Sequence, residues 1–199
     1  MTTDNGGAPC IHGNVLSLSI CKPQIRSTCE KGDWILGIGG KSTIGERLIY
    51  IAQITQKLIN GEYYCDTQYH HRPDCIYRWS EDEKKYYWEK GKKYHKNGLQ
   101  LEHDLGVVTE NYKNANTLLS NNFIYFGKID KSDYKLRFNE IKLLIEDLGQ
   151  GHRINHSPKL KGELRQLIED SLSLSTFYDP TESDVDKLCN IDDDCQECC

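Results

Sequence analysis

The sequence has no long apolar run and lacks several motifs that would identify a reaction. None of its segments approaches the roughly 18 consecutive apolar residues of a membrane-spanning helix, and no signal peptide is visible. The hydrolase motif GxSxG, the zinc-protease motif HExxH and the glycine-rich dinucleotide fingerprint are absent. These absences argue against the most familiar hydrolase, metalloprotease and dinucleotide-binding enzymes, and they predict a cytoplasmic protein with no membrane partner.

An excess of positive charge is also missing. The chain carries 25 Lys and Arg against 30 Asp and Glu, a formal net charge of -5. A broad basic face for duplex DNA is therefore not expected, whereas a local basic pocket is compatible with this charge. With 37% hydrophobic and 28% charged residues over 199 positions, the chain has the composition of one globular domain with an appendage.

Cysteine is abundant, with nine residues, but no two CxxC pairs stand at the spacing of a zinc finger. Without a secretory signal, reduced thiols are expected. Four cysteines are predicted to pack as small hydrophobic side chains: Cys21, Cys29, Cys65 and Cys75. The tail holds the secondary candidates for zinc or copper ligands: Cys189, Cys195, Cys198 and Cys199. The acidic run beside them favours a frayed tail, so we predict no cofactor and no metal.

Apolar patterning predicts an α+β protein with a small, curved or barrel-like mixed sheet and C-terminal helices. Strands are expected over 15–20, 34–38, 48–54, 105–109 and 123–126. Helices are expected over 135–148 and 161–174, with shorter helical turns over 22–30 and 63–69. Loops are expected over 1–13, 39–45 and 111–122, and 80–93 reads as an exposed charged insertion.

These elements predict a single domain over 1–178 and a mobile, acidic, cysteine-rich tail over 179–199. The segment 60–100 is an insertion of a different kind, because it holds seven of the twelve tyrosines and two of the three tryptophans.

Cationic groups and glycines converge near the N-terminus and predict an anion site. Lys22 and Arg26 stand four apart and would share a helical face, where they either clamp a phosphate or remain a solvated pair. The loop Gly39, Gly40 and Lys41 follows, with backbone amides that can approach a ligand. Its spacing differs from GxxxxGK[ST], which argues against NTP hydrolysis.

Aromatic and polar residues elsewhere suit the recognition of a base by stacking and by edge contacts. The candidates for these contacts are Trp34, Tyr69, His70, Arg72, Asn122, Phe123, Tyr125, His152 and Arg153. His103 and Asp104 are candidates for an acid–base pair, although neighbouring side chains seldom face each other, so His103 is equally a ligand contact.

Several strings occur in an order that resembles the nucleotide modification associated domain 2 family over roughly residues 4–155. They are DNGGAP at 4–9, Gly13, CKPQIR at 21–26, GDWILG at 32–37, SNNFIYFG at 120–127 and GHR at 151–153. The resemblance implies a phage or bacterial setting in which modified DNA bases are handled, including defence. The sequence departs from that pattern by beginning inside or just after the expected first strand and by its cysteine-rich tail.

A more distant similarity of pattern links the segments up to residue 54 to PUA-like domains, the group that includes EVE and ASCH domains. That similarity implies a small barrel whose pocket takes up a base. The leading hypothesis is therefore recognition of a nucleotide or modified nucleobase, with DNA reached only through a local pocket. Two alternatives stay open: an enzyme that installs, processes or removes a modified base, and a protein–protein adaptor that uses the aromatic segment 60–100.

Overall fold

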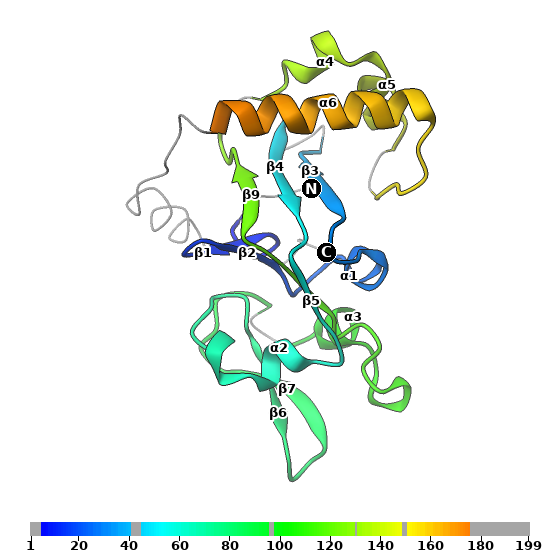
Figure 1. The fold of residues 1–199 in the computed structure, drawn as a ribbon. Helices are drawn as coiled ribbons and strands as arrows, with labels where there is room; N and C mark the ends of the chain where they lie inside the picture. The colour runs from blue at the N-terminus through cyan, green and yellow to red at the C-terminus, as the bar shows by residue number, and fades with distance from the viewer. Residues whose placement is uncertain (1–4, 41–44, 96–97, 130, 149–150, 176–199) are drawn as a thin grey trace. The chain divides into compact units, whose positions relative to one another are not determined.

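The computed structural model describes residues 5–40, 45–95, 98–129, 131–148 and 151–175 (Figure 1). These residues form two compact units. The helical unit contains the described residues of Trp34–Ala52 and Phe123–Thr181, and the tyrosine-rich unit contains those of Asn5–Asp33 and Gln53–Asn122. Lys41 and the four tail cysteines that were predicted as site residues lie outside the described residues, as does the predicted tail.

The helical unit is built on a three-stranded sheet in the order β3-β4-β9. The strands are β3 (Trp34–Ile38), β4 (Leu48–Gln53) and β9 (Asn122–Tyr125). Three helices complete the unit: α4 (Tyr134–Arg137), α5 (Asn139–Leu148) and α6 (Pro158–Ser175). Figure 1 shows α6 as the longest of these helices, drawn in yellow and orange, and α5 packs against it.

Alternation along β3 explains how this sheet meets its helices. Trp34, Leu36 and Ile38 stand two apart and therefore share one face of the strand. They pack against a buried cluster composed of Leu48, Ile51, Tyr134, Phe138, Ile141, Ile145, Leu160 and Leu167. Burial of these side chains is the main stabilising contribution to the unit.

The predicted helix over 135–148 is divided in two at Phe138, whose backbone is extended. The ring of Phe138 is buried in the core cluster, so packing overrides the helical pattern at that position. Helix α6 begins earlier than predicted, at Pro158, where a proline costs nothing because the first helical amide needs no acceptor. The hydroxyl of Ser157 accepts the Leu160 amide and caps the helix.

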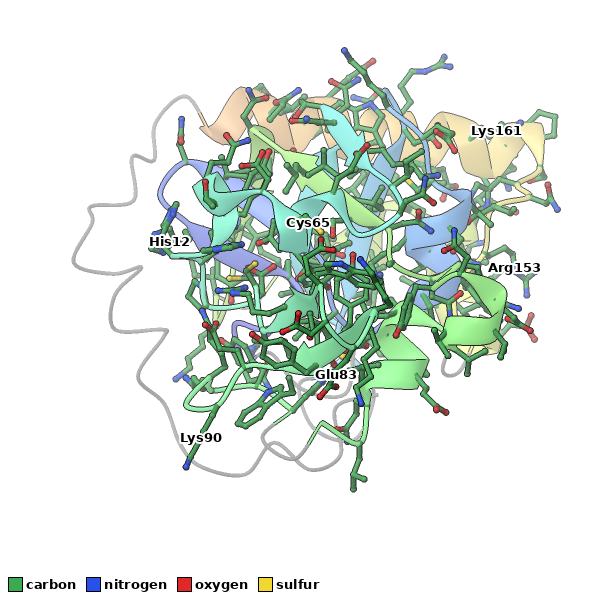
Figure 2. All side chains as sticks on the ribbon, turned by 90° about the horizontal axis from the view of Figure 1, so that it is seen from below. His12, Cys65, Glu83, Lys90, Arg153 and Lys161 are labelled. Carbon is green, nitrogen blue, oxygen red and sulfur yellow. The ribbon has the colours of Figure 1, made fainter. Side chains whose placement is uncertain are left out.

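The tyrosine-rich unit holds a four-stranded antiparallel sheet in the order β1-β2-β8-β5 and a two-stranded hairpin β6-β7. The strands are β1 (Cys10–His12), β2 (Val15–Leu18), β5 (Gln56–Leu58), β6 (Tyr77–Ser80), β7 (Lys85–Trp88) and β8 (Thr117–Ser120). Short helical elements are α1 (Pro23–Thr28), α2 (Glu62–Cys65), η1 (Thr67–Tyr69), α3 (Leu101–Leu105) and η2 (Val108–Glu110). The exposed turn of the hairpin carries Glu83 (Figure 2).

The core of this unit is largely aromatic. Its buried tyrosines are Tyr63, Tyr64, Tyr77, Tyr86, Tyr94 and Tyr112. Several of these rings meet edge to face, for example Tyr64 with Tyr77 at a centroid distance of 5.5 Å and Tyr86 with Tyr112 at 4.9 Å. Edge-to-face pairs are favourable beyond the area that they bury.

The predicted α+β class with C-terminal helices is confirmed, but the strands of the described residues form three small sheets and no closed barrel. The strand predicted over 105–109 is wrong, because α3 and η2 occupy that region. The loops predicted over 1–13 and 111–122 contain β1 and β8, and the charged insertion 80–93 contains β7 of the hairpin. Of the helices described, none is both long and apolar enough to cross a membrane.

Two glycines provide a matched test of packing in the helical unit. A Cβ atom at Gly37 would stand 1.9 Å from Cε1 of the buried Tyr50, whereas one at Gly162 in α6 would have no atom within 4 Å. We expect Gly37→Ala to lower the free energy of unfolding by about 1–3 kcal/mol through overpacking. Gly162→Ala should raise it by about 0.5–1 kcal/mol, because alanine favours the helix. Denaturant unfolding of both variants checks this, and a Gly37→Ala protein as stable as the parent would contradict it.

Candidate functional site

The carboxylate of Asp104, in α3, is fully buried and surrounded by hydrogen-bond donors. Its Oδ1 accepts the backbone N–H of Cys21 at 2.7 Å, and its Oδ2 accepts the Tyr77 hydroxyl at 2.8 Å. The Nδ1 atom of His95 lies 2.8 Å from Oδ2, and that of His103 lies 3.5 Å from Oδ1. Segments that are up to 83 residues apart therefore meet at one carboxylate.

These donors keep the carboxylate ionised. Burial by itself raises the pKa of Asp104, because a charge is poorly solvated in the protein interior. Hydrogen bonds from His103 and His95, together with the nearby charge of Arg26, outweigh burial and hold the pKa below its ordinary value of 3.8. The phenol of Tyr77 responds in the opposite direction, since burial and the Asp104 charge raise its pKa.

Cys21 lies in the turn that joins strand β2 to helix α1, beside this carboxylate. Its φ angle is 55° and that of Lys22 is 48°, so two consecutive residues other than glycine adopt the left-handed conformation. Such backbone is costly for residues that carry a Cβ atom and persists only where its surroundings enforce it. The Sγ atom of Cys21 lies 3.6 Å from Nε2 of His95. The thiol, the imidazole and the carboxylate of Asp104 therefore stand in a row.

Arg26 braces this arrangement from inside the protein. Its side chain is fully buried, and its Nε donates to the carbonyl of Cys21 at 2.7 Å. One terminal nitrogen donates to the carbonyls of Asn114 and Asn116, and the other donates to the carbonyl of Asp104. The guanidinium therefore ties the Cys21 turn to α3 and to the chain that leads into β8.

A second buried network surrounds Asp74. Its Oδ2 accepts hydroxyl hydrogen bonds from Ser17 at 2.6 Å and Ser19 at 2.7 Å, and its Oδ1 accepts the Tyr63 hydroxyl at 2.8 Å. The Nε atom of Arg72 lies 3.6 Å from Oδ1, while its terminal nitrogens donate to carbonyls of the β1–β2 hairpin. The predicted base contact Arg72 is thus buried with its guanidinium directed at the protein itself.

The N-terminal segment of the described chain lies against Tyr94, the residue before His95. The Tyr94 hydroxyl donates to the carbonyl of Asn5 at 3.2 Å. A Cβ atom at Gly7 would stand 3.0 Å from the Tyr94 ring, so only glycine allows this close approach without a shift. Asn5 and Gly7, from the family-like string at 4–9, therefore lie against Tyr94, and Cys21, from the string at 21–26, contacts the adjacent His95.

Other predicted contacts in the tyrosine-rich unit have the following places. Lys22 is partly exposed, and His103 is 47% exposed at its side chain. Tyr69 stacks on Tyr63 with ring centroids 4.8 Å apart, and Nε2 of His70 lies 3.1 Å from the Tyr64 carbonyl. The Asn122 amide donates to the side chain of Gln53. Lys22 and Arg26 do not share an open face, because Arg26 points inward.

The remaining predicted contacts belong to the helical unit: Trp34, Gly39, Gly40, Phe123, Tyr125, His152 and Arg153. Trp34 packs against the core cluster. Arg153, labelled in Figure 2, forms an ion pair with Asp147 at 3.3 Å. Within the parts of the chain that the structure describes, no group of three or more His, Cys, Asp or Glu side chains is arranged to hold a metal ion.

No chemical role for Cys21, Tyr77 or His95 was predicted from the sequence. These residues are far apart in the sequence, so they do not form a recognisable short motif. Cys21 was predicted only to pack as a small hydrophobic side chain. The signal that was available is the resemblance string at 21–26, which contains both Cys21 and Arg26.

The family model described as nucleotide modification associated domain 2 matches residues 1–187. No curated protein and no solved structure matches the chain.

The role of Arg26 as a brace predicts a large loss of stability on its removal. Arg26→Met leaves four carbonyl groups without their donor, and we expect the free energy of unfolding to fall by about 3 kcal/mol or more. Arg153→Met, which removes one exposed ion pair, should change it by no more than about 0.5 kcal/mol. Denaturant titration of the two variants decides the matter; equal stability would remove Arg26 from the framework of the site.

The lowered pKa of Asp104 predicts a dependence of stability on pH. A carboxyl with a lower pKa in the folded state stabilises that state above its ordinary pKa, and the contribution is lost as the pH falls. The stability difference between the parent and Asp104→Asn should therefore be greatest near neutral pH and shrink below about pH 4. Unfolding curves from pH 7 to pH 3 measure it, with Asp82→Asn in the exposed hairpin turn as control. A difference that does not change with pH would contradict the assignment.

Proposed function

Because the chain belongs to the nucleotide modification associated domain 2 family, we propose that it recognises a nucleotide or modified nucleobase within a nucleotide-modification system. Membership implies association with such systems. The phage or bacterial defence setting, and contact with DNA through a local pocket, belong to the same proposal. The net charge of -5 is consistent with contact to only a few phosphates and a shallow dependence of DNA affinity on salt.

The observation that carries the proposal is the pair of partly exposed basic residues, Lys22 and His103, that adjoin the Cys21–Asp104 contact in sequence. Lys22 follows Cys21, whose N–H binds Oδ1 of Asp104, and His103 precedes Asp104 and approaches the same oxygen at 3.5 Å. Both residues therefore belong to the two segments that meet at this carboxylate. Lys22 supplies a compact positive charge for a phosphate, and His103 supplies a ring nitrogen for the edge of a base.

Hydrogen bonds hold the backbone next to these residues, which favours binding. Arg26 donates to the carbonyls of Cys21 and Asp104, so the backbone that carries Lys22 and His103 is constrained before a ligand arrives. A site that is organised in advance loses less conformational entropy on binding. In this proposal the phosphate contact is made by Lys22, with Arg26 as its support.

The enzyme alternative remains a second candidate, and the alignment of Cys21, His95 and Asp104 favours it specifically. The adaptor alternative has less support, because most aromatic side chains of the segment 60–100 pack in or against the core cluster of the unit.

Binding of nucleotides tests the proposal. In calorimetry or thermal shift with nucleoside monophosphates that carry plain and modified bases, Lys22→Ala should weaken binding by about 1.5–3 kcal/mol, the range for hydrogen bonds to charged groups. His103→Ala should weaken binding chiefly for ligands that present a polar base edge. Lys85→Ala, which removes an exposed positive charge on β7, is the matched control and should leave affinity unchanged.

Two results would contradict the proposal. Absence of binding across the whole panel would remove nucleotide recognition, and unchanged affinity in both Lys22→Ala and His103→Ala would move the site elsewhere.

A further inference from the structure

We propose that Cys21 is a catalytic nucleophile, with His95 as its general base and Asp104 as the residue that positions the imidazole. Nothing in the family description assigns a reaction to this group of side chains. For the class of ligand, the inference rests on the function proposed above; for the nucleophile itself, it rests on geometry alone.

The geometry is that of a nucleophile–base–carboxylate triad. Sγ of Cys21 lies 3.6 Å from Nε2 of His95, a contact within the 4.0 Å that a sulfur hydrogen bond allows. The other ring nitrogen, Nδ1, lies 2.8 Å from Oδ2 of Asp104. A carboxylate on one side of an imidazole fixes its orientation and stabilises the positive charge that it acquires when it takes a proton on the other side.

The backbone around Cys21 gives a second, independent reason. A strained turn between a strand and a helix is a common position for a nucleophile, and Cys21 occupies such a turn between β2 and α1, with only 3% of the residue exposed. The consecutive left-handed conformations of Cys21 and Lys22 are held by three hydrogen bonds: the Cys21 N–H to Asp104, the Cys21 carbonyl to Arg26, and the Lys22 carbonyl to the Arg26 N–H. Strain that the surrounding structure enforces is concentrated at functional sites.

The other two buried thiols of the unit lie in different surroundings. Burial and the nearby Asp74 charge raise the pKa of Cys10, and burial raises the pKa of Cys75 to about 11. The thiol of Cys75 points toward the carbonyl of Tyr63 at 3.7 Å. Cys10 and Cys75 thus serve as internal references for a buried thiol that stays protonated.

The chemistry that fits this triad is acyl transfer from an amide or ester carried by a nucleotide or modified base. The thiol proton passes to Nε2 of His95 as Sγ attacks the carbonyl carbon and a C–S bond forms. The C–N or C–O bond then breaks, and His95 gives the proton to the departing amine or alcohol. Water next donates a proton to His95 and its oxygen attacks the thioester. The C–S bond breaks, the acid leaves, and Cys21 regains its proton.

Alkylation by iodoacetamide tests the nucleophile without any substrate. Mass analysis of peptides from the full chain, taken over a time course near neutral pH, gives a separate rate for each cysteine. We expect Cys21 to react at least about tenfold faster than Cys10 and Cys75, because the thiolate is the reactive form. His95→Asn should remove that advantage while Cys65, which is exposed, keeps its rate. Cys21 reacting as slowly as Cys10 and Cys75 in the parent protein would overturn the nucleophile.

Acylated nucleotides test the reaction. Deoxycytidine and deoxyadenosine monophosphates with an acetylated exocyclic amine, and a 5-acetoxymethyl pyrimidine nucleotide as the ester, are incubated with the parent protein, Cys21→Ala and His95→Asn. We expect deacylation with an acetyl thioester on Cys21, lost in Cys21→Ala and slowed about a hundredfold or more in His95→Asn. Thermal melting confirms that each variant is folded.

The outcomes separate this inference from the proposed function. Two results would overturn the acyl-transfer assignment. One is deacylation without an adduct on Cys21, and the other is no deacylation although Cys21 is reactive toward iodoacetamide. Nucleotide affinity is measured separately on Cys21→Ala, which retains Lys22 and His103. A failure of binding there contradicts recognition, and a failure of turnover with binding intact contradicts catalysis.

Discussion

The ionised carboxylate of Asp104 is the interaction on which the tyrosine-rich unit depends. A buried charge is tolerated only when donors surround it, and here the donors come from the β2–α1 turn, from β6, from the segment before α3 and from α3 itself. Each of these segments must therefore reach its place together with the others. The position of the Cys21 thiol and the orientation of the His95 ring both follow from this one requirement.

Two buried arginines also hold distant segments of the unit together through hydrogen bonds. Arg26 and Arg72 each direct a guanidinium at several backbone carbonyls, and each stands near a buried aspartate. An aromatic core has few ways to fix the register of short strands, and polar networks of this kind supply directional constraints. Lys22 and His103, which are partly exposed, adjoin this network in sequence.

Local patterns in the sequence predicted much of the secondary structure. Two signals depend only on residues that are close in the sequence. They are the alternation of Trp34, Leu36 and Ile38 in β3 and the proline at the start of α1. The hairpin β6-β7 was not predicted because its sequence is rich in charged residues, and β8 was not predicted because it follows an asparagine-rich stretch. Strands β6 and β7 are stabilised by pairing with each other, and β8 by pairing with the distant strand β2. The family resemblance, carried by short strings in order, is confirmed by the match over 1–187.

The candidate site was harder to predict than the fold. The side chain of Arg26 was expected to face solvent from its four-residue spacing to Lys22, but its length lets it turn inward to carbonyls far along the chain. Cys21 and His95 are 74 residues apart, and no periodicity connects them. Their meeting is a property of tertiary structure, which a reading of adjacent residues does not contain.

The tyrosine-rich unit is discontinuous in the sequence, since residues 34–52 belong to the other unit, and this has a consequence for synthesis on the ribosome. Cys21 and Arg26 emerge early, yet Asp104, Asn114 and Asn116, which accept their hydrogen bonds, emerge much later. Until then the nascent chain exposes an unpaired guanidinium and a thiol outside its final setting. Closure of these distant contacts is slow compared with local folding. A ribosome stalled before residue 116 therefore holds a chain in which the Cys21 turn has not yet formed its complete set of native contacts.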